Sequence, residues 1–103
     1  MFMPQAADAL ARPLSSWTSA QLSAVVRSAA LTINPRTDAL KATRAAGEAA
    51  ADSVVDLDMN GAMVAKWSLE QWAEFCGHRG FALKLTGVLS TAGTAPVSVC
   101  RPN

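Results

Sequence analysis

The sequence lacks the residues and motifs on which most enzyme mechanisms depend. Its 103 residues contain no tyrosine and a single histidine, His78. A histidine-based triad would have to use that residue, and no nucleophile motif such as G-x-S-x-G accompanies it. A glycine-rich phosphate loop is also missing. We therefore expect a protein with no enzymatic activity and no cofactor.

Long apolar runs are absent as well. No stretch of roughly 18 apolar residues exists, so the sequence predicts no membrane span. The first residues, MFMPQ, lack the basic region and apolar run of a signal peptide. In a chain without that signal, the two cysteines, Cys76 and Cys100, are typical of free thiols. We expect an intracellular protein, cytoplasmic or nuclear.

Candidate metal ligands are few. Cys76 and His78 are close in sequence, but zinc needs further ligands at set spacings, and only Cys100 and the aspartates remain. Asp56 and Asp58 would project to one side of a strand, as hard-metal ligands do, but no second acidic motif accompanies them. We interpret Cys76 as structural, His78 as a surface residue and the aspartates as solvated, and predict no metal site.

The clearest positive signal is a six-residue motif that occurs in two similar copies, WTSAQL at 17–22 and WSLEQW at 67–72. In each copy a Ser or Thr is followed three residues later by Gln, the pattern of a capping box at a helix start. The flanking apolar residues occupy the positions of a hydrophobic staple. Two helices should therefore begin near residues 18 and 68, with Trp67 and Trp72 largely buried. Because the residues beyond each copy of the motif differ, we interpret the two copies as similar helix caps and not as an internal repeat.

The remaining pattern divides the chain into a single domain and two ends. Residues 1–16 are predicted to be a flexible N-terminal arm, 17–90 the domain and 91–103 a flexible tail. Residues 38–52 are rich in alanine, which predicts either a surface helix or a partly ordered insertion. The helix at 18–31 carries one apolar stripe, formed by Leu22, Val25, Val26, Ala29 and Ala30.

Two segments fit either helix or strand. Residues 54–67 resemble a hairpin, because Asn60-Gly61 suits a type I′ turn, but 62–66 also fits a short helix. Residues 81–89 alternate like a strand and also show helical spacing. Local pattern slightly favours the hairpin, which leaves an α+β fold, with a hairpin at 54–67 and a C-terminal strand pair, as the alternative to an all-α fold.

The segment from residue 58 to residue 72 contains Met59-Asn60-Gly61, and apolar, hydroxyl and Glu-Gln-aromatic positions follow it without a gap. This pattern resembles the centre of a sterile alpha motif (SAM) domain of the Pointed branch. The first helix matches the family's opening through Trp17, Leu22, Val25, Val26 and Leu31. The last helix matches through Gly80, Leu83, Leu85 and Leu89. The resemblance implies an all-α, five-helix bundle, in which 62–66 and 81–89 are helices and 35–52 is inserted.

Charge is unevenly distributed along the chain. Residues 1–47 carry a net charge of +3, residues 48–74 carry −5 and residues 75–103 carry +3. Family members associate head to tail through a mid-domain face and an end-helix face, and the charge pattern fits this arrangement. The predicted acidic mid-domain face consists of Asp56, Asp58, Met63, Glu70 and Glu74. The predicted end-helix face, lying opposite, consists of Arg79, Phe81, Ala82 and Lys84.

We therefore expect a non-enzymatic protein–protein interaction module that binds itself or a related domain. One alternative is a small regulator or inhibitor, of the kind encoded by mobile elements or phages, that binds a basic host protein. A second is weak nucleic-acid binding through a basic patch of Arg27, Arg36, Lys41 and Arg44. Nucleic acid is not the expected partner, because the net charge is only +1 and no aromatic residues lie between these side chains.

Overall fold

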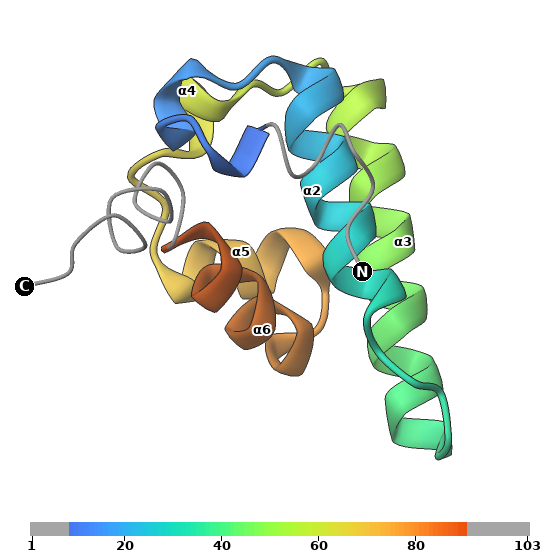
Figure 1. Ribbon diagram of the computed structural model, residues 1–103. Coiled ribbons are helices and arrows are strands. Elements are labelled where there is room, and N and C mark those ends of the chain that lie inside the picture. The colour runs from blue at the N-terminus through green and yellow to red at the C-terminus, as the bar shows by residue number, and fades with distance from the viewer. Residues whose placement is uncertain (1–8, 91–103) are drawn as a thin grey trace, which may run out of the picture.

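The computed structural model describes residues 9–90. Our predictions for residues 1–8, for the tail at 91–103 and for Cys100 lie outside the described residues. The elements are the 3₁₀ turn η1 (Leu14–Ser16) and the helices α2 (Ser19–Leu31), α3 (Asp38–Asp56), α4 (Gly61–Val64), α5 (Leu69–Cys76) and α6 (Arg79–Leu89), arranged as in Figure 1. Residues 9–90 contain no strand, so the all-α prediction is confirmed and the α+β alternative is wrong.

Capping boxes begin α2 and α5, as the repeated motif predicts. Thr18 Oγ1 accepts a hydrogen bond from the N–H of Gln21 at 3.2 Å, and Gln21 Oε1 accepts one from the N–H of Thr18 at 2.9 Å. Ser68 and Gln71 make the same two bonds at 3.3 and 2.8 Å. Each box satisfies two of the N–H groups that a helix start leaves unpaired. Both predicted helix starts are confirmed.

The tryptophans in the two copies of the motif differ in burial. Trp17 and Trp72 are 2% and 1% exposed, whereas Trp67 is only partly buried. The rings of Trp67 and Trp72 meet edge to face, with their centroids 4.8 Å apart. The predicted burial is confirmed for Trp72. Trp67 precedes its helix cap and lies at the edge of the core, so part of its surface reaches solvent.

The core is built around α2 and α3, which lie side by side in Figure 1 and form the most extensive helix pair. The predicted stripe of α2 is fully buried. Ser23 Oγ, also buried, donates a hydrogen bond to the carbonyl of Ala51 on α3 at 2.8 Å. The buried residues of α3 are small, namely Gly47, Ala50, Ala51 and Val54. Residues 38–52, from the expected insertion, therefore form most of a regular helix that belongs to the core.

The Asn-Gly pair forms a helix start and not a hairpin turn. Asn60 Oδ1 accepts a hydrogen bond from the N–H of Met63 at 3.0 Å and so caps α4. The N–H of Gly61 donates to the carbonyl of Trp17 at 2.9 Å. A Cβ atom at position 61 would lie 1.8 Å from the carbonyl oxygen of Leu14. Glycine is needed here because two backbone segments pass in direct contact.

Residues 9–16 pack against the domain, although the sequence predicts a loose arm there. Ala9 is fully buried, and Leu10 and Leu14 pack against the core. The indole N–H of Trp17 donates to the carbonyl of Arg12 at 3.2 Å. These few anchors suffice because η1 lies directly against α4.

The last two helices form a tight hairpin. Gly77 ends α5 in the left-handed conformation, with a φ of 70°, and its N–H donates to the carbonyl of Ala73 at 2.9 Å. His78 Nδ1 then accepts a hydrogen bond from the N–H of Phe81 at 3.2 Å and caps α6. Residues 81–89 are helical, as the family resemblance implies. Among residues 9–90, no helix combines the length and apolarity needed to cross a membrane.

Candidate functional site

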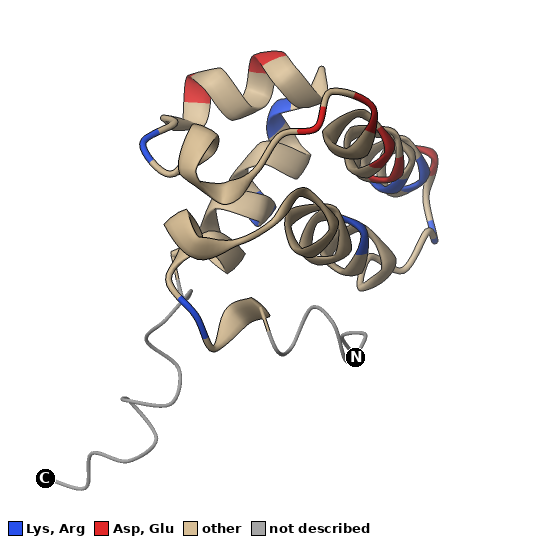
Figure 2. Cartoon of the chain, turned by 90° about the horizontal axis from the view of Figure 1, so that it is seen from above, with Lys and Arg blue, Asp and Glu red and all other residues tan. Residues whose placement is uncertain are grey.

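The residues of the predicted acidic face are exposed but lie on separate elements. Asp56 and Asp58 are at the end of α3, Met63 is on α4, and Glu70 and Glu74 are on α5. In Figure 2 the acidic positions lie in the upper part of the view, on α5, on α3 and just after α3. The predicted face therefore separates into an acidic end of α3 and an acidic side of α5.

The end of α3 combines negative charge with exposed apolar side chains. We call Val55, Asp56, Leu57 and Asp58 the α3 end. Val55 is 54% exposed and Leu57 is 63% exposed, both high values for large apolar residues. Asp56 makes no ion pair within residues 9–90. Asp58 Oδ1 accepts a 3.2 Å hydrogen bond from Ser19 Oγ. This surface offers both a charge and apolar area to a partner.

The backbone at the α3 end is a Schellman motif that carries an aspartate where glycine is usual. The N–H of Met59 donates to the carbonyl of Val54 at 2.9 Å, and the N–H of Asp58 donates to that of Val55 at 3.0 Å. Asp58 has a φ of 50°. Carboxylates also interact unfavourably with the free carbonyls of a helix C-terminus, and the last turn of α3 holds no basic residue. The carboxylate of Asp56 therefore lowers stability here, so fold stability does not explain this residue.

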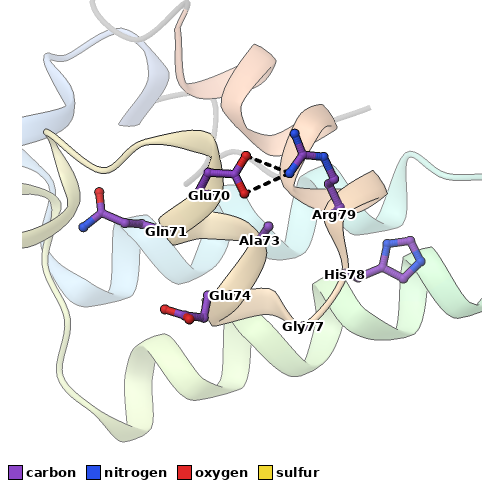
Figure 3. Close-up of a pocket in the computed structure, with 7 residues that line it drawn as sticks. All are labelled: Glu70, Gln71, Ala73, Glu74, Gly77, His78 and Arg79. Atoms are coloured by element: carbon purple, nitrogen blue, oxygen red, sulfur yellow. Dashed lines mark hydrogen bonds and ion pairs between the residues drawn. The ribbon is translucent and has the colours of Figure 1, made fainter.

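A shallow hollow between α5 and α6 brings acidic and basic residues of the two predicted faces together (Figure 3). It encloses about 560 Å³ and is lined by Glu70, Gln71, Ala73, Glu74, Gly77, His78 and Arg79. Arg79 Nη1 donates to both carboxylate oxygens of Glu70, at 2.9 and 2.8 Å. We expected these two charges on opposite faces, and this expectation is wrong for Glu70 and Arg79. The short turn at Gly77 folds α6 back along α5 and places the two side chains in contact.

Two residues of the predicted end-helix face are in the core. Phe81 and Ala82 are 0% exposed, so neither side chain lies on a surface, which corrects that part of the prediction. Helical periodicity explains the difference, because positions 81, 82, 85 and 89 share one side of α6 and that side packs inward. Lys84 is exposed, and the neighbouring Leu83 is 55% exposed.

Lys84 instead lines a groove with apolar and basic members, which the sequence does not predict. The groove encloses about 500 Å³ between the start of α3, the loop before it, and α6. Its apolar members are Ile33 and Leu40, and its charged members are Arg36 and Lys84, neither of which forms an ion pair within residues 9–90. We call this the basic groove, and Asn34, Thr43 and Gly80 complete its lining. Its residues come from separate parts of the chain, so the sequence did not predict the groove. Of its members, only Arg36 and Lys84 were named as candidate site residues, because they are basic.

The predicted nucleic-acid patch is partly neutralised. Arg27 forms an ion pair with Asp52, and Arg44 Nε lies 3.4 Å from Glu48 Oε2. Each pair joins a basic residue of the patch to a carboxylate on α3. An anion at this surface would have to compete with those carboxylates. Within the described residues this leaves Arg36 and Lys41, of the four, without a carboxylate partner.

Cys76 and His78 have structural surroundings. Burial raises the pKa of the half-buried Cys76 thiol to about 11. His78 caps α6 through Nδ1, and its Nε2 lies 3.4 Å from Thr43 Oγ1, which itself donates to the carbonyl of Ala39. This chain of contacts ties the start of α6 to α3. Among residues 9–90, no three His, Cys, Asp or Glu side chains gather as metal ligands would.

Comparison of the chain with protein-family models, with curated proteins and with solved structures finds no match.

Proposed function

We propose that the chain is a protein–protein interaction module of SAM type that binds further copies of itself head to tail, through the α3 end and the basic groove. One observation carries this proposal: the two surfaces have opposite charge, and each adds exposed or groove-lining apolar side chains. Asp56 on one surface and Arg36 and Lys84 on the other form no ion pair within residues 9–90. Opposite charge steers the encounter, and apolar contact then contributes affinity.

The positions of the two surfaces favour contact between molecules over contact within one. Leu40 and Thr43 of the basic groove lie near the start of α3, and the α3 end lies at its other terminus. A helix of 19 residues is about 28 Å long. A single molecule therefore cannot bring the two surfaces together. When two copies bind, one surface of each kind stays free, so a contact of this type extends into a chain or closes into a ring.

Light scattering after size exclusion, measured across protein concentration and salt, tests self-association. The mean mass should rise with concentration and fall with added salt, because exposed charges are screened. Asp56→Lys and Lys84→Glu should each weaken assembly, since like charges would then meet across the contact. Asp56 is a better site than Asp58, which has the left-handed backbone, and a lysine suits a helix C-terminus. Lys66→Glu is the matched control, because Lys66 is exposed and lines neither surface.

Mixing the two variants gives the sharpest test. Asp56→Lys keeps its basic groove and Lys84→Glu keeps its α3 end, so one native contact forms and yields a dimer that grows no further. A wild-type chain that remains monomeric at high concentration and low salt overturns self-association. The acidic α3 end would then favour the alternative of a small regulator that binds a basic protein.

A further inference from the structure

A smaller hollow lies on α5 beside the one in Figure 3. It encloses about 270 Å³ and is lined by Trp67, Gln71, Glu74 and Phe75. These positions share one side of α5 and the approach to its cap, because they recur at helical spacing. Trp67 and Phe75 are both only partly buried. Each ring therefore offers part of its surface to whatever occupies the hollow.

The two rings are held in place by the core. Their centroids are 5.6 Å apart with an angle of 64° between the planes. Both also contact the buried ring of Trp72, at centroid distances of 4.8 Å for Trp67 and 6.0 Å for Phe75. A third ring beneath the other two fixes their orientation. Exposed aromatic faces carry partial negative charge and attract cations within about 6 Å of the ring centroid.

The polar members of the hollow complement the rings. Figure 3 shows Gln71 and Glu74 pointing to the same side of α5, away from the pair formed by Glu70 and Arg79. Glu74 is exposed and forms no ion pair within residues 9–90. Gln71 Oε1 is occupied by the N–H of Ser68 at 2.8 Å, so the amide NH₂ remains to donate to a ligand. The hollow thus offers a carboxylate, a donor and two aromatic surfaces.

We propose that this hollow binds one arginine side chain of a partner protein. The guanidinium group stacks against Trp67 or Phe75 and donates hydrogen bonds to the carboxylate of Glu74. The NH₂ group of Gln71 donates to a backbone carbonyl next to the arginine. Arginine fits better than lysine, because a planar guanidinium can stack on a ring while it donates two bonds to a carboxylate. The volume of about 270 Å³ suits a single side chain and excludes a helix. This site goes beyond the proposed self-association and does not require it.

A peptide titration followed by ¹H–¹⁵N NMR tests the assignment. The probe is acetyl-Gly-Arg-Gly-amide, and the control is the same peptide with citrulline, which has nearly the same shape but no charge. The arginine peptide should shift the indole N–H signal of Trp67 and the side-chain NH₂ signals of Gln71 in a saturable manner. The citrulline and lysine peptides should bind more weakly. The titration is repeated on Asp56→Lys, so that loss of self-association is distinguished from loss of this site.

A pair of variants on the same helix completes the test. Glu74→Gln should weaken binding of the arginine peptide about threefold to fivefold, the upper part of the range for one exposed charge pair. Glu70→Gln should leave it unchanged, because Glu70 does not line this hollow. Equal binding of the citrulline or lysine peptide, equal binding by Glu74→Gln, or shifts centred on another surface would each overturn the proposal.

Discussion

Replacing Gly47 with alanine should have two opposite effects on the free energy of unfolding: a gain from helix propensity and a loss from core packing. Gly47 lies inside α3, where alanine is better than glycine by about 1 kcal/mol on propensity alone. From the sequence, which marks Gly47 as a weak point of its helix, the variant should be more stable. In the structure, however, an added Cβ would lie 2.5 and 2.6 Å from ring atoms of Phe81 and 2.7 Å from the Cβ of Ala30.

The packing term should exceed the propensity term. Phe81 and Ala30 are both 0% exposed, so neither can move aside into solvent, and protein cores are close-packed. The Cβ of Ala30 can shift only with the backbone of α2. Adding a methyl group to a well-packed core costs about 1–3 kcal/mol, and contacts this short place the cost near the upper value. After the propensity gain, the free energy of unfolding should fall by about 2 kcal/mol.

Thermal unfolding followed by circular dichroism measures the difference. For a domain of this size, about 2 kcal/mol corresponds to a Tm lower by about 8–16 °C. Gly87→Ala is the matched control, because Gly87 lies inside α6 and an added Cβ there meets no atom within 4 Å. That variant should raise the free energy of unfolding by up to about 1 kcal/mol.

A Gly47→Ala protein as stable as the wild type, or more stable, would refute the placement of Phe81 against α3. The double variant Gly47→Ala/Phe81→Leu gives an independent check. Shortening the ring makes room for the new methyl group, so the two changes together should cost less than the sum of their separate effects. Additive costs would show that positions 47 and 81 do not touch.

Three further predictions concern single residues. Thr18→Ala and Ser68→Ala should each lower the free energy of unfolding by about 1 kcal/mol in urea titrations, because each removes a helix cap, and unchanged midpoints would contradict the capping boxes. Asp58→Gly should raise the free energy of unfolding by about 1 kcal/mol and Asp58→Ala should lower it, since position 58 has a positive φ, and the reverse order would contradict that geometry. Cys76 in a Cys100→Ala background should react slowly with iodoacetamide at about pH 8, where about one thiol in a thousand is ionised, and faster as the pH nears 11. A reaction rate with iodoacetamide equal to that of a small free thiol at pH 8 would contradict the burial of Cys76. Because the Cys76 thiol ionises at lower pH in the unfolded chain, the free energy of unfolding should also fall as the pH rises from about 9 to 11.

The amino-acid sequence by itself determined the features that depend on neighbouring residues. The helix starts at Thr18 and Ser68 were predictable because a capping box needs only residues three apart. The buried stripe of α2 follows from helical spacing. The exposed carboxylates of the predicted acidic face were also identified, since charged side chains avoid a core of this size.

Only the tertiary structure decided how these elements meet. Residues 54–67 fit a hairpin locally, but α3 continues to Asp56 because its small residues pack along α2. Phe81 and Ala82 lie in the core because the apolar side of α6 packs inward, and helical spacing identifies that side only once residues 81–89 are known to form a helix and not a strand. The ion pair of Glu70 with Arg79 and the basic groove join residues distant in sequence. Such contacts depend on how helices dock, and docking depends on the volumes of side chains from the whole chain.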